Sequence, residues 1–430
     1  MIIRLPRRAA QPFSGILEIH QLVCLPPNNI NRDDHGIPKV ALFGGVRRGR
    51  ISSQALRAQT RRAMMNLGLI PKSEYGQRTK RLVDAVCEQL GDLNRSADAV
   101  TCALAALGYS LERNKKTGEV KLGALLFIGP DELTLLASAV RAHHTELLTY
   151  YDNVVKPAPQ DKPIKRKPGR AAPDTSAADA TLEHAFPDLP RADSWKGFAK
   201  DHKAAYATLQ QAIGKTKAPD VALFGRFVAH APDKSIDGAL YTGHALTIDA
   251  TTAQNDFFSA LDDRQADDSN GSAHIDTQTF QSGVFYRYDA VDLASLHRNT
   301  CQDDQYTADL LASFIHATVT TLPSGKQRSF GAYAMPSTVL LVFKPHAQQT
   351  SLMNAFETPV TRNLRDNRNI SEEGATLLLA QYRREQQMYD MNAQAFVLDG
   401  TGAAIPAGVT ALPNLDTLIL TALQAAVKPQ

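Results

Sequence analysis

A glycine turn runs into the start of a helix in Phe43-Gly44-Gly45-Val46-Arg47-Arg48-Gly49-Arg50-Ile51-Ser52-Ser53-Gln54-Ala55-Leu56-Arg57. Together with Arg61 and Arg62, this stretch holds six arginines and no acidic residue. An arginine side chain offers a planar fork of donors that fits a phosphate group, and it stays charged near pH 7. Glycines let the backbone approach a ligand, and serines suit a helix start, where free N–H groups attract anions. The stretch therefore predicts a phosphate-binding corner.

The residues after this corner are predicted to form a helix over 53–67. At about 100° per residue, Gln54, Arg57 and Arg61 share one face, which we expect to point outward. Leu56, Ala63 and Leu67 fall on the opposite face, which we expect to pack inward.

The other arginines, Arg47, Arg48 and Arg50, precede the helix and can serve the turn, a neighbouring subunit or adjacent phosphates. The stretch matches neither a P-loop nor a GxGxxG motif, so a nucleotide cofactor is not expected. The density of arginine favours a polyanion over a single phosphate. The alternative is a solvated charged face without a ligand.

Length and composition suit a globular protein. The 430 residues can form a large core and more than one structural unit, and the net charge of +3 does not by itself indicate nucleic acid. The four cysteines are far apart and form no CxxC pair, so neither a zinc site nor a disulfide framework is expected. Free cysteines, with no signal-peptide or membrane-spanning pattern, predict a cytoplasmic protein without membrane contact.

Three stretches read as strands, at 15–23, 283–289 and 339–343, because their apolar residues alternate or run continuously. Helices are predicted at 306–321 and through most of 72–217. The order strand, helix, long helical excursion, strand, helix, strand suits an α+β fold with a small split sheet and a large insertion. From about residue 346 the chain is expected to be helical and peripheral.

A basic, proline-rich segment interrupts the helical block. Residues 156–173 hold six basic residues, one acid and five prolines, which predicts a flexible exposed insertion. Its stretch 156–170 is a candidate surface for target DNA, and an unpartnered linker is an equal alternative.

No catalytic site is predicted. Asp33 and Asp34 could ligate a divalent metal, but no spacing brings further acids to them, so an orienting role in the loop is preferred. The histidines form no HExxH pattern and GxSxG is absent, so we expect no catalytic residue, metal or cofactor.

Basic and aromatic residues mix in Gly325-Lys326-Gln327-Arg328-Ser329-Phe330-Gly331-Ala332-Tyr333. Such a mixture is loosely similar to the RNA-binding strand of an RRM, although Ser329 stands where that motif has glycine. A plain loop leading into a strand is an equal alternative.

Taken together, these motifs resemble the CasC family, the repeated backbone subunit of the type I-E CRISPR surveillance complex Cascade. They occur in the family's order over roughly residues 15–345. They are a leucine-rich strand, Asn31-Arg32-Asp33-Asp34, Phe43-Gly44-Gly45, Arg47-Arg48, Arg50-Ile51-Ser52-Ser53-Gln54, Gly271-Ser272-Ala273-His274, Ser282-Gly283-Val284-Phe285-Tyr286-Arg287-Tyr288 and Lys326-Gln327-Arg328.

The resemblance implies a hand-like protein with an RRM-like (ferredoxin-like) palm. The palm would comprise residues 1–70 and 251–345. A helical finger insertion would occupy 71–220, with a flexible basic linker at 156–193. A thumb loop would occupy 221–250, although the tip at 227–232 matches no family motif. Residues 346–430 would form the peripheral helical part.

The resemblance also implies a function in antiviral defence. Copies would stack head-to-tail along crRNA, join the other Cascade subunits and present the guide to target DNA, and a helicase-nuclease would be recruited to the complex. The crRNA contacts implied by the family are Arg32, Lys39, Ser52, Gln54, Arg57 and Arg61. We add Arg47, Arg48, Arg50, Lys326 and Arg328 as RNA-binding candidates. The rival hypothesis is a metal-dependent endoribonuclease that uses Asp33 or Asp34, and a third is a generic RNA-binding module that acts alone.

Overall fold

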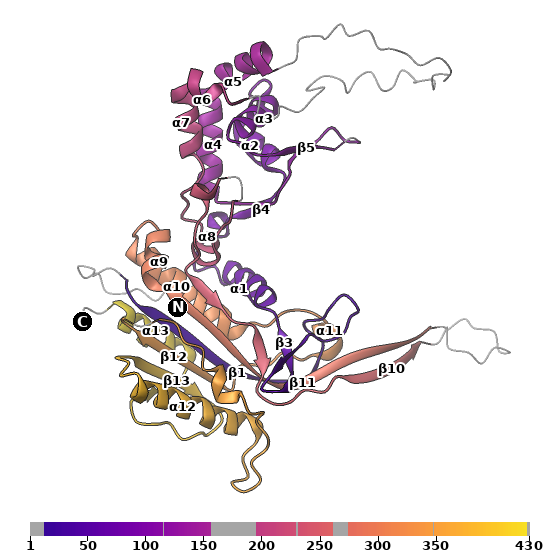
Figure 1. Cartoon of the computed structure of the whole chain (residues 1–430), viewed down its shortest axis with the longest axis vertical. Coiled ribbons are helices and arrows are strands. Elements are labelled where there is room, and N and C mark those ends of the chain that lie inside the picture. Colours follow the sequence, from indigo (N-terminus) through magenta and orange to yellow (C-terminus); the bar gives the residue numbers. More distant parts are fainter. Residues whose placement is uncertain are drawn as a thin grey trace, which may run out of the picture. The chain divides into compact units, whose positions relative to one another are not determined.

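The computed structural model describes residues 13–114, 116–155, 195–228, 231–260, 274–346 and 348–427. The chain divides into two compact units (Figure 1). The sheet unit comprises Met1–Lys72 and Ala239–Gln430, and the insertion unit comprises Ser73–Gly238. The boundary between the two units falls inside the predicted thumb, residues 221–250.

A large mixed sheet organises the sheet unit. Its order is β14-β13-β12-β1-β11-β9-β3-β2, with β8 and β10 also paired to β11. The central strand β1 runs antiparallel to both β11 and β12, so that Ile19 lies between Asp289 and Leu341. The strands are β1 (Ile16–Asn28), β2 (Val40–Phe43), β3 (Val46–Ile51), β8 (Leu240–Thr242), β9 (Ala245–Thr247), β10 (Gln254–Ala260), β11 (His274–Asp292), β12 (Thr338–Lys344), β13 (Gln394–Asp399) and β14 (Val409–Ala411).

Helices cover both faces of this sheet. The helices of this unit are α1 (Ser53–Leu67), α9 (Leu293–Asn299), α10 (Asp304–Thr320), α11 (Gln327–Phe330), α12 (Ile370–Met388) and α13 (Leu415–Val427), with a short 3-10 helix η5 (Met353–Phe356). On one face, Leu56 of α1 packs with Val23 and Phe285. On the other face, Leu378 of α12 packs with Tyr286. Because both faces are covered, every residue of β1 from Ile16 to Val23 is buried, including the polar Glu18, His20 and Gln21.

The helix predicted at 53–67 is confirmed with the same bounds. Its buried face differs from the prediction, because it consists of Leu56, Thr60 and Met64, whereas Ala63 is half-buried and Leu67 is exposed.

The prediction of a peripheral, helical part from residue 346 was wrong. This part supplies β13, which pairs with β12, and β14, which pairs with β13. Its helix α12 packs over the sheet and buries Leu378 and Leu379 completely. The C-terminal part is therefore built into the core of the sheet unit.

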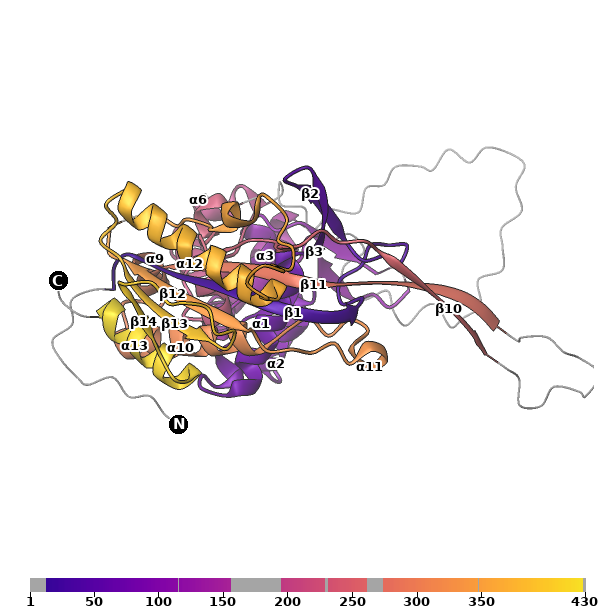
Figure 2. The same cartoon turned by 90° about the horizontal axis from the view of Figure 1, so that it is seen from below.

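A long hairpin extends from the sheet (Figure 2). Strand β10 pairs with the first residues of β11, from Gln254↔Phe280 to Ala260↔His274. Every residue of β10 is exposed, including Phe257 and Phe258. We call this hairpin, 254–260 with 274–280, the arm.

The insertion unit is mostly helical, as predicted, but it also contains two small strand pairs. Its helices are α2 (Leu82–Leu90), α3 (Ser96–Ala106), α4 (Pro130–Ala142), α5 (His144–Tyr150), α6 (Phe198–Asp201), α7 (Lys203–Gln211) and α8 (Pro219–Phe224), with short helical turns η1 (Lys72–Glu74), η2 (Tyr151–Val155) and η4 (Pro232–Lys234). The strand pairs are β4 (Gln77–Thr79) with β7 (Leu126–Ile128), and β5 (Leu111–Arg113) with β6 (Val120–Leu122). A buried ion pair joins Arg226 Nη1 to Glu132 Oε2 at 2.6 Å.

Across the described ranges, no helix has the length and apolar character needed to cross a membrane.

Candidate nucleic-acid interface

The loop before β2 is fastened to the end of β3. The Lys39 amide donates to the Asn31 carbonyl at 3.0 Å, and the Arg50 amide donates to the Lys39 carbonyl at 2.8 Å. The Asn31 Oδ1 accepts the backbone amide of Ser52 at 2.9 Å. Three residues that the sequence analysis proposed for RNA binding, Lys39, Arg50 and Ser52, are thereby brought together.

The first turn of α1 begins beside this loop. Ser52 is the N-cap, and its hydroxyl accepts the Ala55 amide at 3.3 Å. The Ser53 amide donates to His244 Nδ1 at 2.9 Å. Among the described residues, the Gln54 amide has no acceptor. A helix start is expected to leave several amides free, whereas the described residues supply acceptors for the amides of Ser53, Ala55 and Leu56.

The cationic side chains around this turn lack partners. Arg32 and Arg47 are exposed, while Lys39 and Arg50 are half-buried. Within the described part of the chain, none of the four side chains makes a hydrogen bond or an ion pair. Unpaired guanidinium and ammonium groups held on a fixed backbone can bind phosphate oxygens.

The face of α1 that carries Gln54, Arg57 and Arg61 is less open than predicted. Gln54 is exposed, but Arg57 and Arg61 are half-buried. Arg57 Nη2 donates to the Leu240 carbonyl at 3.1 Å. Burial lowers the pKa of Arg57, and the nearby charge of Asp289 opposes that shift. Arg57 therefore keeps only part of its donor fork for a ligand.

Arg48 has a structural role. Its side chain is fully buried, and Nη1 donates to the Ile248 carbonyl at 2.5 Å while Nη2 donates to the Phe356 carbonyl at 2.9 Å. Further bonds reach the Phe43, Thr247 and Glu357 carbonyls. Three roles were open for this arginine: support of the turn, contact with a neighbouring subunit and contact with adjacent phosphates. The structure supports the first role, so we remove Arg48 from the RNA-binding candidates.

The turn before Arg48 needs glycine. Gly44 has φ +59°, and a Cβ there would lie 1.7 Å from the Glu357 carbonyl oxygen. The hairpin between β2 and β3 therefore rests directly on the C-terminal segment, and Arg48 fixes it there.

Lys326 and Arg328 lie in a loop that leads into β12, which is the second of the two alternatives for this stretch, and not on an RRM-like strand. Within this loop Gln327–Phe330 form the short helix α11, and Lys326 is the residue that precedes it. Both side chains are exposed, and Gly325 packs against the carbonyl of Ile30 at the start of the loop that carries Arg32. The Phe330 ring lies 6.1 Å from that of Phe280, at the base of the arm.

The acidic pair of the same loop is arranged as a turn. Asp33 Oδ1 accepts the amides of His35 and Ile37 at 3.0 and 2.9 Å. Asp34 is exposed, with His35 Nε2 4.0 Å from its carboxylate. Across the part of the chain that the structure describes, no group of three or more His, Cys, Asp or Glu side chains is placed to hold a metal ion.

Several predicted features lie outside the described residues. These are the basic linker at 156–193, Ala229 and His230 of the predicted thumb tip, and Gly271, Ser272 and Ala273. Two contributors to the interface were given no role by the sequence analysis, namely Asn31 and His244. The only local sign in the sequence of a role for His244 is its place after Gly243, between two short strands.

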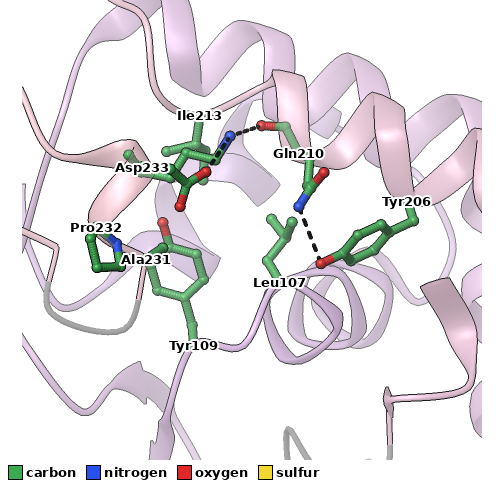
Figure 3. A pocket seen from close by; sticks show the side chains of 9 residues that line it. Leu107, Tyr109, Tyr206, Gln210, Ile213, Ala231, Pro232 and Asp233 are labelled. Atoms are coloured by element: carbon green, nitrogen blue, oxygen red, sulfur yellow. Dashed lines mark hydrogen bonds and ion pairs between the residues drawn. The ribbon is translucent and has the colours of Figure 1, made fainter.

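The insertion unit contains a separate cavity of about 180 Å³ (Figure 3). Tyr109, Tyr206 and Gln210 line it together with Asp233, and Gln210 Nε2 donates to the Tyr206 hydroxyl at 3.3 Å. None of the RNA-binding candidates is among the residues that line this cavity.

Solved structures share this fold. A chain of a "CRISPR RNA-guided surveillance complex, pre-nicking" aligns with a TM-score of 0.72 at 24% identity, covering 96% of this chain and 100% of that chain. A chain of a "CRISPR RNA-guided surveillance complex" aligns with a TM-score of 0.64 at 20% identity, covering 95% and 99%. Among curated proteins, no sequence matches.

The sequence itself matches one family. The match runs from residue 17 to residue 420 and thus includes both units and the whole described interface. The protein therefore belongs to the Cas_CT1975 family, described as CT1975-like protein.

Proposed function

We propose that the protein is a non-catalytic subunit of a CRISPR RNA-guided surveillance complex that binds the backbone of crRNA. The observation that carries this proposal is a set of cations around the start of α1 whose side chains have no partner among the described residues, namely Arg32, Lys39, Arg47 and Arg50. The fold shared with chains of two such complexes supports it.

The chemistry of the interface fits a guide RNA. A guide must be held whatever its sequence, so the protein needs contacts to phosphate and sugar that leave the base edges free to pair. The interface offers arginine and lysine side chains and, among the described residues, one backbone amide without an acceptor.

The sheet supports an RRM-like palm. The order β12-β1-β11-β9, antiparallel throughout, with α1 and α10 packed together, is the arrangement expected of a ferredoxin-like core. In this reading the insertion unit is the finger region.

We assign the role of the thumb to the arm, in place of the segment 221–250 expected from the sequence. The arm projects from the palm sheet and exposes Phe257 and Ile275. A two-stranded hairpin is only marginally stable alone in water, so the arm is expected to be stabilised by a second copy or by RNA.

The finer assignment is a backbone subunit of type I-E Cascade, acting in the cytoplasm. Copies would assemble head-to-tail along crRNA, join other Cascade subunits and hold target DNA through the guide, with a helicase-nuclease recruited to the complex. A net charge of +3 per copy is compatible with this, because charge adds along the filament.

Sizing of copurified RNA tests this function. The chain is expressed with its partner subunits and a CRISPR array, and RNA is extracted from the purified complex. One discrete protected length is expected. A complex without RNA, or with RNA of random length, would contradict the proposal.

A further inference from the structure

His244 lies beside the first turn of α1, although it is distant from that helix in sequence. It is exposed and lies between β8 and β9. Strand β9 pairs with β3 through Ile51↔Ala245, which brings His244 beside the first residue of α1. Its Nδ1 accepts the Ser53 amide at 2.9 Å.

This hydrogen bond fixes the protonation of the ring. A backbone amide can only donate, so Nδ1 must present a lone pair, and the proton of the neutral imidazole lies on Nε2. Partial burial and the charges of Arg50 and Lys39 lower the pKa of His244. The ring is therefore neutral at pH 7, and it carries an N–H donor at Nε2.

The Nε2–H has no acceptor within the described residues. Arg50 of β3 and Lys39 of the preceding loop are near enough for their charges to act on the ring. The amide of Gln54, which has no acceptor within the described residues, follows Ser53 in the same turn. All of these groups attract an acceptor that carries negative charge, and none of them is suited to read a particular base.

We propose that His244 is a further RNA-binding residue, whose neutral Nε2–H donates to a phosphate oxygen of the strand held by Arg50 and Lys39. This inference rests on the proposed function. One ring nitrogen accepts the Ser53 amide at the helix start, and the other ring nitrogen offers an N–H donor to the phosphate. The bond from Ser53 polarises the imidazole and so strengthens the donor at Nε2.

A neutral donor has a signature that separates it from arginine or lysine. Each cation that binds a phosphate displaces counterions, and its loss makes log K against log salt shallower by about 0.7 for a single strand. Loss of a neutral donor weakens binding and leaves this slope unchanged.

Two substitutions separate contact with RNA from capping of α1. In His244→Asn the amide oxygen can still accept from Ser53, but the donor at the position of Nε2 is lost. In His244→Ala both are lost. Binding of the full-length chain to a fluorescent single-stranded oligouridine is measured at several salt concentrations, and melting temperature reports on the fold.

The expected result is that His244→Asn melts like the wild type and binds about tenfold more weakly with an unchanged salt slope. If His244→Asn binds like the wild type while His244→Ala is weakened, the histidine only caps the helix and the inference fails. A shallower slope in His244→Asn would also overturn it, because the ring would then be charged in the complex. If the wild type binds no RNA, the proposed function itself fails.

Discussion

Arg48 Nη2 donates to the carbonyl of Phe356 at 2.9 Å, across a sequence separation of 308 residues. This bond joins the glycine hairpin to the C-terminal segment. The arginines of the stretch 47–50 therefore have two different roles. Arg48 stabilises the fold through its buried hydrogen bonds, whereas the guanidinium groups of Arg47 and Arg50 have no partner in the part of the chain that the structure describes.

Replacement of Arg48 should damage the fold. Arg48→Met would leave several buried carbonyl groups without a donor, so the free energy of unfolding should fall by about 2–4 kcal/mol. Chemical denaturation measures this change. The matched control is Arg47→Met, on the exposed neighbour, which should change stability by less than about 0.5 kcal/mol. Equal effects of the two substitutions would contradict the division of roles.

Loss of Arg57 and Arg61 should weaken RNA binding. The double substitution Arg57→Ala/Arg61→Ala removes two cations from the α1 face, so the slope of log K against log salt should become shallower by up to about 1.4. The expected change is smaller than that if Arg57 keeps its bond to the Leu240 carbonyl in the complex. A fluorescence binding titration over a range of salt concentrations measures both quantities.

The control for this double substitution removes two exposed arginines elsewhere. Arg383→Ala/Arg384→Ala lies on α12, which packs on the opposite face of the sheet from α1. It has the same change in net charge and should leave affinity and slope nearly unchanged. If both double substitutions weaken binding alike, the RNA is held by net charge and not by the α1 face.

Glu18 should make the stability of the sheet unit sensitive to acid. Its buried carboxylate accepts from Lys344 Nζ at 2.9 and 3.0 Å. Burial raises the pKa of Glu18, but the hydrogen bond and charge of His20 and the charge of Lys344 outweigh it and hold the pKa below its usual value. A lowered pKa contributes stability above the unfolded-state value of about 4.3, and this contribution is lost as the pH falls below it.

The test compares the wild type with Glu18→Gln/Lys344→Met, in which the buried pair is replaced by uncharged groups. Unfolding free energies between about pH 5 and pH 3 should fall more steeply in the wild type. The single substitution Glu18→Gln should cost about 3–5 kcal/mol at pH 7, because it leaves the Lys344 ammonium buried and unpaired. Parallel pH profiles of the wild type and the double variant would refute the role of this pair.

The non-catalytic proposal and the ribonuclease hypothesis predict different results for substitution of Asp33. Its carboxylate shapes the loop by accepting two backbone amides, so Asp33→Ala should lower RNA affinity modestly by loosening the position of Arg32. Purified protein with magnesium should leave a labelled RNA intact. Cleavage that requires magnesium and disappears in Asp33→Ala would instead support an endoribonuclease.

Local signals in the sequence were sufficient to predict where α1 begins and where the central residues of the main strands lie. Ser52 is a strong N-cap, and the apolar spacing after it gives a helix of the observed length. By contrast, the burial of Arg48 and the capping by Asn31 and His244 depend on groups from distant segments, which no local pattern reveals. The arm was missed because β10 is exposed on both faces and lacks the alternation of a half-buried strand.

The central claim is that copies of this chain assemble along RNA. Native mass spectrometry of the full-length chain with single-stranded RNAs of increasing length tests it most directly, because it counts the copies on each RNA. The account predicts that the number of bound copies rises in regular steps with RNA length. A single copy on every RNA whatever its length would contradict it, and would identify a binding module that acts alone.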